Sequence, residues 1–194
     1  MRYSMILGIT GGIGCGKTTA ANLFENKGFS RIDSDQLMHA NVLASNEVLT
    51  AIRAHFGSGV FDATGALNRA SLAAIVFTDA HELRWLENLT HPKLFELWRQ
   101  KLATNPEGKW VIETPLLFEA KLENWFDFTV CVACSSDLQR NRLEQRGLNR
   151  ELAQQRIAQQ LPLSRKIEWA DFVLWNSSST AFLEAQIDRL VANL

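Results

Sequence analysis

The clearest structural signal in the chain is the sequence Met5-Ile6-Leu7-Gly8-Ile9-Thr10-Gly11-Gly12-Ile13-Gly14-Cys15-Gly16-Lys17-Thr18. Its first half is an apolar run typical of a buried strand, and from Gly11 to Thr18 it fits the pattern G-x-x-x-x-G-K-[ST]. The residues that follow, Thr18–Lys27, are rich in helix formers. A strand, a glycine-rich loop and a helix in this order predict a P-loop. Its glycines let backbone N–H groups point inward, and the helix N-terminus adds positive potential for phosphates.

Two side chains of this motif are expected to carry its chemistry. Lys17 is predicted to reach the β- and γ-phosphates of ATP, and the hydroxyl of Thr18 to ligate Mg²⁺. The residues predicted to bind the nucleotide are Gly11, Gly12, Ile13, Gly14, Cys15, Gly16, Lys17, Thr18 and Thr19. A glycine-rich turn that binds nothing is the alternative, which the complete motif between a strand and a helix disfavours.

Further apolar runs predict the rest of a parallel sheet, because strands covered on both faces are apolar without alternation. The runs are Ser4–Thr10, Trp110–Glu113, Phe126–Cys134 and Asp171–Trp175, with Phe29–Asp33 as a fifth and weaker candidate. Helices are predicted at Thr18–Lys27, at Ser135–Arg146 and from Thr180, where an apolar stripe begins with Phe182 and Leu183. Strands that alternate with helices predict an α/β protein, here a P-loop NTPase-type three-layer fold with a parallel five-stranded sheet.

Two segments interrupt this alternation. Residues 42–104 are helical by pattern, and Pro92 is expected to separate a helix at Glu82–Leu89 from another at Lys93–Leu102. Residues 140–166 are polar and rich in Arg and Gln, which indicates an exposed helical pair. The predicted organisation is a core of residues 1–41, 105–139 and 167–194, a helical insertion at 42–104 and a lid at 140–166.

The second predicted strand ends in Arg31-Ile32-Asp33-Ser34-Asp35, which places two carboxylates at its carboxyl end. Ligands of open α/β sheets bind at the carboxyl ends of the strands, next to the phosphate loop in this case. Asp33 is therefore the candidate base or hydroxyl-orienting group for phosphoryl transfer to an alcohol. Asp35 is as well explained as an N-cap of the next helix, and both residues could be only caps or solvated loop residues.

Arginines follow the strand at Phe126–Cys134. Arg142 and Arg146 are four residues apart and so share a helix face, and Arg140 lies nearby. A mobile helix that folds these cations over ATP would stabilise the transferring phosphate and exclude water. A solvated surface helix explains the same residues equally well.

Other chemically active residues have structural alternatives. Glu113 closes a strand and resembles a loose Walker B acid that could hold Mg²⁺ through water, or it is a hydrogen-bonded strand-end carboxylate. His91, before Pro92, is more typical of a packed or capping histidine than of a catalytic one. Cys131 and Cys134 have redox-motif spacing, but they lie in a strand and are interpreted as core cysteines. Cys15 lies at a helix N-terminus, so its thiol pKa is expected to be depressed and its alkylation to block ATP.

Composition excludes several classes of protein. The 194 residues carry 20 Lys and Arg against 21 Asp and Glu, which argues against a nucleic-acid partner. No apolar stretch approaches membrane-spanning length, and the N-terminus has no cleavage site of a signal peptide, so no membrane association is expected. Three cysteines, an odd number, suit a reducing cytoplasm. No oligomeric state is predicted.

With these residues placed, the chain resembles the dephospho-coenzyme A kinase family from end to end. Its P-loop is widely shared, but Pro115-Leu116-Leu117-Phe118-Glu119, Asp33-Ser34-Asp35 and the tail Ala170-Asp171…Asn176 are much more specific. The other landmarks of the resemblance are Leu67-Asn68-Arg69, His91-Pro92, Gln139, Arg142, Arg146 and Gln160.

The resemblance implies ATP-dependent phosphorylation of the ribose 3′-hydroxyl of dephospho-coenzyme A, the last step of coenzyme A synthesis. It implies that Asp33 is the base, that Lys17, Arg142 and Arg146 act in catalysis, and that the helical insertion holds the coenzyme A precursor. Nucleotide binding then extends to Arg142 and Asn176, and acceptor binding to Asp33, Asp35, His91, Pro115 and Leu116. ATP and dephospho-coenzyme A are the expected small-molecule substrates, with Mg²⁺ as cofactor.

The chain departs from the family pattern at four positions, none of which removes a residue that the chemistry requires. Ser34 replaces an alanine, Cys15 a serine and Thr114 an apolar residue, and Gly147 stands where an aspartate often follows the lid arginine. The nearest rival is another small-molecule or nucleoside-monophosphate kinase on the same framework. A P-loop switch or ATPase is a more distant rival, because the sequence has no N-K-x-D motif of GTPases and no Asp-Glu Walker B pair.

Overall fold

The computed structural model describes residues 5–194 and divides the chain into two compact units. One unit contains the chain up to Asp33 together with Asn105–Leu194, and the other contains Ser34–Thr104. The helical unit thus starts at Ser34, earlier than residue 42 where the predicted insertion begins. Residues 140–166 belong to the first unit. Residues 1–4, with the first residue of the predicted strand Ser4–Thr10, lie outside the described part.

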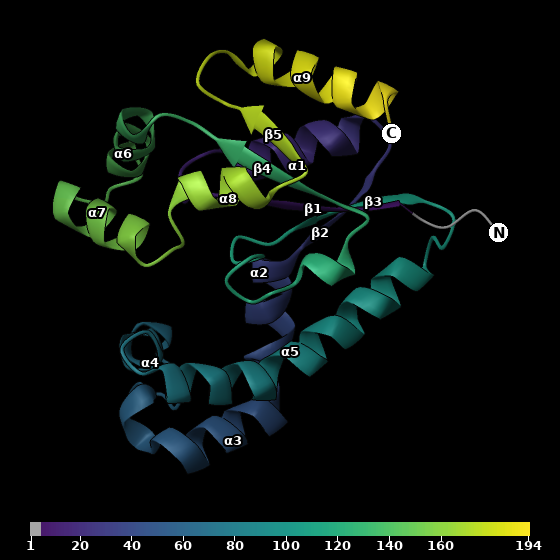
Figure 1. The fold of residues 1–194 in the computed structure, drawn as a ribbon. Coiled ribbons are helices and arrows are strands. Elements are labelled where there is room, and N and C mark those ends of the chain that lie inside the picture. The colour runs from purple at the N-terminus through teal and green to yellow at the C-terminus, as the bar shows by residue number, and fades with distance from the viewer. Residues whose placement is uncertain (1–4) are drawn as a thin grey trace. The chain divides into compact units, whose positions relative to one another are not determined.

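The first unit is built on a sheet of five parallel strands, as predicted (Figure 1). The strands are β1 Met5–Gly11, β2 Ser30–Asp33, β3 Lys109–Glu113, β4 Phe128–Ala133 and β5 Phe172–Trp175, in the order β2-β3-β1-β4-β5. The central strand β1 pairs with β3 on one side and β4 on the other, with Leu7 opposite both Val111 and Phe128. The loop that follows β1 therefore leaves the middle of the sheet at the carboxyl ends of its neighbours.

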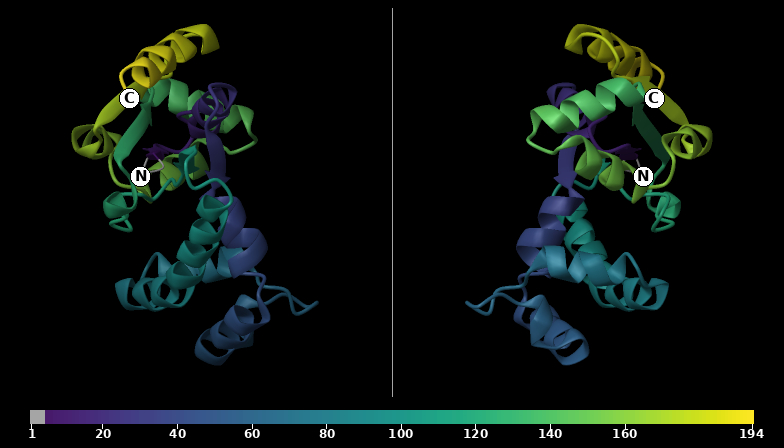
Figure 2. Two further views of the ribbon diagram at one scale, coloured as in Figure 1. Left: turned by 90° about the vertical axis from the view of Figure 1, so that its right-hand side faces the viewer. Right: turned by 90° about the vertical axis from the view of Figure 1, so that its left-hand side faces the viewer.

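Helices cover this sheet. Helices α1 (Lys17–Asn26) and α9 (Thr180–Ala192) contact each other over one face, whereas α8 (Leu163–Trp169) contacts β1 and β4 over the other (Figures 1 and 2). Helices α6 (Ser136–Gln145) and α7 (Arg150–Ala158) pack together after β4, and a short 3₁₀-helix spans Glu123–Trp125. The buried core under α1 and α9 contains Leu7, Ile9, Ala20, Ala21, Leu23, Phe24, Phe29, Val111, Val130, Val132, Leu174, Leu183, Ile187 and Leu190. The three-layer prediction is confirmed.

The predicted apolar stripe of the last helix is wrong at its first residue. Leu183 and Ile187 are fully buried, but Phe182 is 49% exposed. The buried residues Leu183, Ile187 and Leu190 are three or four positions apart and form one face of the helix, and Phe182, directly before Leu183, lies to the side of that face.

The second unit is built of helices, with one isolated antiparallel bridge between Phe61 and Leu67. It contains α2 (Ser34–Leu37), a π-helix at Met38–Val42, α3 (Asn46–Phe56), a 3₁₀-helix at Ser58–Val60, α4 (Arg69–Val76) and α5 (Ala80–Ala103). Side-chain oxygens of Ser45, Asn68 and Asp79 cap α3, α4 and α5 respectively. Asp35 lies inside the first turn of α2, so the alternative that it caps this helix is wrong.

The predicted break at Pro92 is also wrong, because α5 runs as one helix from Ala80 to Ala103 (Figure 1). A proline inside a helix has no N–H to donate and costs about 3 kcal/mol. The buried residues of α5 are Thr90, Leu94 and Trp98, which are spaced by four on one face that continues past Pro92. Burial of this face offsets the cost of the proline. The local sequence around Pro92 does not reveal that burial. Nowhere in residues 5–194 is there a helix both long and apolar enough to cross a membrane.

Candidate nucleotide and phosphoryl-transfer site

The loop between β1 and α1 has the backbone of a phosphate cradle. Gly11, Gly14 and Gly16 have φ values of 143°, 78° and 96°, which side chains with a Cβ rarely adopt. At Gly16, an added Cβ would also lie 2.1 Å from Nδ2 of Asn176. The sequence therefore requires glycine here for two reasons, and the loop delivers the chain directly into the N-terminus of α1.

Lys17 folds back over this loop. Its Nζ donates to the carbonyl oxygens of Gly11 at 3.2 Å and Gly12 at 3.1 Å, and the residue is only 8% exposed. The ammonium group is thus held above the glycine backbone, where a phosphate would meet it. The neighbouring residues Thr18 and Thr19, at the start of α1, are exposed.

A chain of charged and polar groups joins the first turn of α1 to the ends of β3 and β2. The Thr18 hydroxyl donates to Oε1 of Glu113 at 2.8 Å, and Oε2 of Glu113 lies 2.9 Å from Nη2 of Arg31. The same Arg31 nitrogen lies 3.3 Å from Oδ2 of Asp33. Parallel pairing causes this arrangement, since β2 and β3 set Asp33 directly opposite Glu113. Arg31 and Asp33 are two residues apart and so project from the same face of β2.

This geometry bears on the two alternatives for Glu113. Its carboxylate is hydrogen-bonded at the strand end, and it is also the immediate partner of the proposed Mg²⁺ ligand Thr18. The Thr18 hydroxyl donates a hydrogen bond to Glu113, and the lone pairs of its oxygen stay available to a hard cation. Such cations prefer oxygen ligands. In residues 5–194 no group of three His, Cys, Asp or Glu side chains is arranged to hold a metal.

Side chains from later segments hold the loop from outside. Arg142 of α6 donates to the carbonyl oxygens of Gly14 and Cys15 at 3.4 Å each and to that of Asn176 at 3.1 Å. Asn176, directly after β5, donates its amide to the Cys15 carbonyl at 2.9 Å. Arg142 and Asn176 therefore both reach the P-loop, whereas Arg146 at the end of α6 is exposed.

The three cysteines are buried, and two of them meet. Cys134 lies at the end of β4, and its Sγ donates to Sγ of Cys15 at 3.4 Å. This hydrogen bond lowers the pKa of the Cys15 thiol and raises the pKa of the Cys134 thiol, while burial raises the pKa of Cys131 to about 12. The depressed pKa predicted for Cys15 is confirmed, but its main cause is Cys134, followed among the favourable contributions by the charge of Lys17. Cys15 is fully buried, so alkylation requires the loop to open.

Comparison with known proteins identifies the family to which this site belongs. The family model for dephospho-CoA kinase matches residues 5–181. The chain belongs to the dephospho-CoA kinase family. Curated relatives include the dephospho-CoA kinase of Thermosynechococcus vestitus, 40% identical over 94% of this chain and 91% of its own length. That of Anaeromyxobacter dehalogenans is 39% identical over 97% and 92% respectively.

Solved structures agree with this membership. TT1252 from Thermus thermophilus has a TM-score of 0.88 and 33% identity, and the match covers 100% of this chain and 99% of that one. The dephospho-CoA kinase from Campylobacter jejuni has a TM-score of 0.66 and 25% identity over 96% and 95% of the two chains. A shikimate kinase from Acinetobacter baumannii, at 17% identity and a TM-score of 0.53, shares the fold. The chain is thus a kinase-family member over nearly its full length, on a fold that other P-loop kinases use.

The residues that the family resemblance assigned to the acceptor divide between the two units. Asp33, Pro115 and Leu116 lie in the sheet unit, and Asp35 and His91 lie in the helical unit. Leu116 is 37% exposed after β3. His91 is half-buried in α5 beside Phe95, and burial lowers its pKa, so a neutral, packed imidazole describes it.

Several polar residues around the loop received no role from the sequence. Gln139 donates to the Ile13 carbonyl at 2.6 Å, and Gln160 accepts from the Ile13 N–H at 2.9 Å. The buried Lys166 forms an ion pair nearby with Glu119, which is partly exposed. Gln139, Glu119 and Gln160 were landmarks of the resemblance without a function. Nothing in the sequence around Lys166 indicates that this lysine is buried, because a lysine in a short polar helix is normally exposed.

Proposed function

We propose that this chain transfers the terminal phosphate of ATP to the ribose 3′-hydroxyl of dephospho-coenzyme A, giving coenzyme A and ADP, the last step of coenzyme A biosynthesis. The observation that carries the proposal is the hydrogen-bonded chain Thr18–Glu113–Arg31–Asp33, which joins the P-loop to a strand-end carboxylate in a member of the dephospho-CoA kinase family. A cytoplasmic location is part of the proposal.

The P-loop binds the phosphates of ATP in this mechanism. Backbone N–H groups of Gly11–Thr19 and the N-terminus of α1 bind the anionic oxygens, and Lys17 exchanges its carbonyl partners for the β- and γ-phosphates. Mg²⁺, when bound through the Thr18 hydroxyl, neutralises charge that develops on the phosphates. Arg142 and Asn176 keep the loop carbonyls directed away from the nucleotide.

Asp33 orients the acceptor hydroxyl and accepts its proton as the new O–P bond forms. Support comes from its place at the end of β2, beside the phosphate loop, and from Arg31, which restrains its carboxylate. Arg31 is shared with Glu113, so the two carboxylates are held in a fixed relation. Asp35, His91, Pro115 and Leu116 bind the acceptor, and the helical unit Ser34–Thr104 forms the acceptor-binding insertion.

Residues 140–166 act as a lid in this proposal. Arg146 is exposed at the end of α6 and is available to stabilise the transferring phosphate when the segment closes, whereas Arg142 already contacts the loop. Closure excludes water and so favours transfer to the alcohol over hydrolysis.

An assay of ADP release with ATP and Mg²⁺ tests the proposal. Dephospho-coenzyme A is compared with AMP, adenosine and shikimate as acceptors, and the product is identified by mass. Turnover with dephospho-coenzyme A alone is expected. Turnover only with another acceptor would contradict the acceptor, and ATP hydrolysis independent of every acceptor would contradict the kinase activity.

A further inference from the structure

Helix α8 buries only one of its seven residues, and that residue is Lys166. Its side chain is 0% exposed on the face that packs against β1 and β4. An apolar side chain would fill this position without loss of hydration, and a buried ion pair is often no more stable than an apolar replacement. The buried charge therefore calls for an explanation other than core formation.

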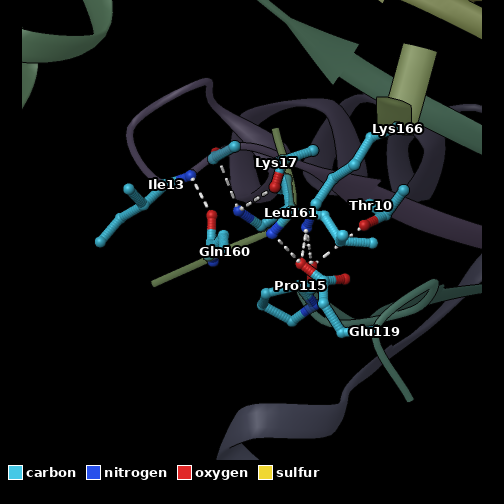
Figure 3. A network of polar contacts seen from close by, with 10 residues as sticks. Thr10, Ile13, Lys17, Pro115, Glu119, Gln160, Leu161 and Lys166 are labelled. Atoms are coloured by element: carbon cyan, nitrogen blue, oxygen red, sulfur yellow. Dashed lines mark hydrogen bonds and ion pairs between the residues drawn. The ribbon is translucent and has the colours of Figure 1, made fainter. Parts of the chain in front are cut away.

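The contacts of Lys166 lead toward the P-loop (Figure 3). Its Nζ lies 2.7 Å from Oε1 of Glu119 and donates to the Pro115 carbonyl at 2.7 Å. The Pro115 carbonyl also accepts from the Thr10 hydroxyl at 3.1 Å. Thr10 directly precedes Gly11, so one ammonium group joins α8 to the turn after β3 and to the start of the loop.

Glu119 extends this path to the other side of the loop. The Oε1 atom that pairs with Lys166 also accepts the Leu161 N–H at 3.0 Å. The preceding residue, Gln160, accepts the Ile13 N–H through its own Oε1 at 2.9 Å. Because Leu161 and Gln160 are adjacent, the position of the Glu119 carboxylate fixes where the Gln160 side chain begins.

The peptide groups of Ile13 are thereby held from both sides. Gln139 of α6 donates to the Ile13 carbonyl at 2.6 Å, opposite the Gln160 contact. The second oxygen of Glu119 is buried without a hydrogen-bond partner among residues 5–194. A carboxylate with one unsatisfied oxygen stabilises the fold less than a fully hydrogen-bonded one. The Lys166–Glu119 pair is therefore better explained by its positioning of Gln160 and Leu161 than by a gain in stability.

We propose that Lys166 and Glu119 are positioning residues for the nucleotide site. The pair fixes the Gln160–Leu161 link, and Gln160 then holds Ile13 so that the loop is ready to receive phosphate. Neither residue touches the reacting atoms. The inference rests on the proposed function in one respect, namely that the P-loop binds ATP.

Binding of ATP in the absence of acceptor tests this inference, measured by calorimetry on the full chain with Mg²⁺. Lys166→Met keeps the length and removes the charge, and we expect the Kd for ATP to rise about 3- to 30-fold. Gln160→Ala should raise it by a similar factor, because both changes release Ile13. The matched control is Arg165→Met, which breaks an exposed pair with Glu168 on the same helix and should leave the Kd unchanged.

The double variant Lys166→Met/Gln160→Ala separates positioning from a general loss of stability. If the two residues act through one path, the double variant binds ATP no more weakly than the weaker-binding single variant. Multiplying factors would overturn the inference, as would an unchanged Kd in a Lys166→Met protein that melts cooperatively.

If Lys166→Met does not fold, the pair Glu119→Gln and Gln160→Ala, with their double variant, gives the same test. Glu119→Gln preserves shape, and Gln160 is only half-buried, so both changes are milder. Weaker ATP binding in both single variants supports the inference if the rise in Kd of the double variant is smaller than the product of the two single rises. Unchanged ATP binding in either single variant overturns it. A wild-type protein that binds ATP but does not phosphorylate dephospho-coenzyme A would contradict the proposed function alone.

Discussion

The Thr18 hydroxyl donates a hydrogen bond of 2.8 Å to Oε1 of Glu113, which joins the first turn of α1 to the end of β3. The other oxygen of the same carboxylate pairs with Arg31. Glu113 is only 6% exposed, so its charge acts in a poorly solvated place beside the predicted Mg²⁺ ligand. A variant that removes the Glu113 charge but keeps the shape of the side chain therefore tests whether this charge supports Mg²⁺ binding.

Glu113→Gln is expected to lower turnover about 10- to 100-fold and to raise the Mg²⁺ concentration needed for half-maximal rate. The amide can still accept from Thr18, but it no longer attracts a cation or balances Arg31. Initial rates over a Mg²⁺ titration at saturating ATP measure both effects. Glu25→Gln, on the exposed side of α1, is the control and should change neither. An unchanged Mg²⁺ dependence would leave Glu113 as a strand-end hydrogen-bond acceptor only.

Asp33→Asn should reduce kcat by about 10²- to 10⁴-fold while the KM for ATP changes little, because the amide cannot accept the acceptor's proton. The variant keeps a side-chain oxygen that can still accept from Arg31, so the restraint on β2 is preserved. Steady-state kinetics with both substrates varied give the two constants. Asp35→Asn is the companion variant, with its main effect expected on the KM for dephospho-coenzyme A. A normal kcat in Asp33→Asn would exclude Asp33 as the base.

Arg142 and Arg146 are expected to fail in different ways when each is replaced by alanine. Arg142 already bonds loop carbonyls, so its loss should weaken ATP binding in the absence of acceptor. Arg146 is exposed, so its loss should leave ATP binding nearly unchanged and lower kcat by about 100- to 1000-fold. Calorimetry and steady-state rates separate the two outcomes. Arg140→Ala, which removes an ion pair with Asp137 on the same helix, is the control. Equal effects of Arg142→Ala and Arg146→Ala on both constants would contradict the assigned roles.

The elements that sequence predicted well are those that local pattern determines. The strand at Trp110–Glu113 and the helix at Ser135–Arg146 are bounded by short-range signals, and the P-loop requires glycine at positions such as Gly16. The continuous helix through Pro92 was missed because its stability comes from a buried face that crosses the proline. Exposure of Phe182 was missed because two adjacent apolar residues, Phe182 and Leu183, were assigned to one face, whereas only Leu183 is in register with Ile187 and Leu190.

The site was harder to predict than the fold because its contacts depend on strand order. Asp33 and Glu113 are opposite each other only because β2 lies next to β3, which the order along the chain does not specify. The role of Arg31 follows from the same pairing. Lys166 is more distant still, since its place beside Glu119 depends on how α8 packs on the sheet. Residue type was enough to select candidate site residues, but strand order and helix packing determine which of them are in contact.

Cys15 should ionise at a lower pH in the wild-type protein than in Cys134→Ala, because the Cys134 thiol donates a hydrogen bond that stabilises the Cys15 thiolate. A lowered pKa increases the thiolate fraction at pH values below the ordinary thiol pKa, and the advantage disappears above it, where both proteins are ionised. The measurement is the rate of iodoacetamide reaction at Cys15 against pH, followed by peptide mass spectrometry in a Cys131→Ala background.

Access and ionisation are separated within this experiment. Cys15 is buried, so its absolute rate includes loop opening, but the ratio of the rate at neutral pH to the plateau at high pH reports ionisation alone. That ratio should fall in Cys134→Ala and recover in part in Cys134→Ser, whose hydroxyl can also donate. ATP should slow the reaction in every variant, since the thiol lies inside the phosphate loop. Identical titration midpoints with and without the Cys134 thiol would show that the sulfur contact does not set the Cys15 pKa, leaving the charge of Lys17 and the backbone hydrogen bonds from residues 12 and 134 as the causes.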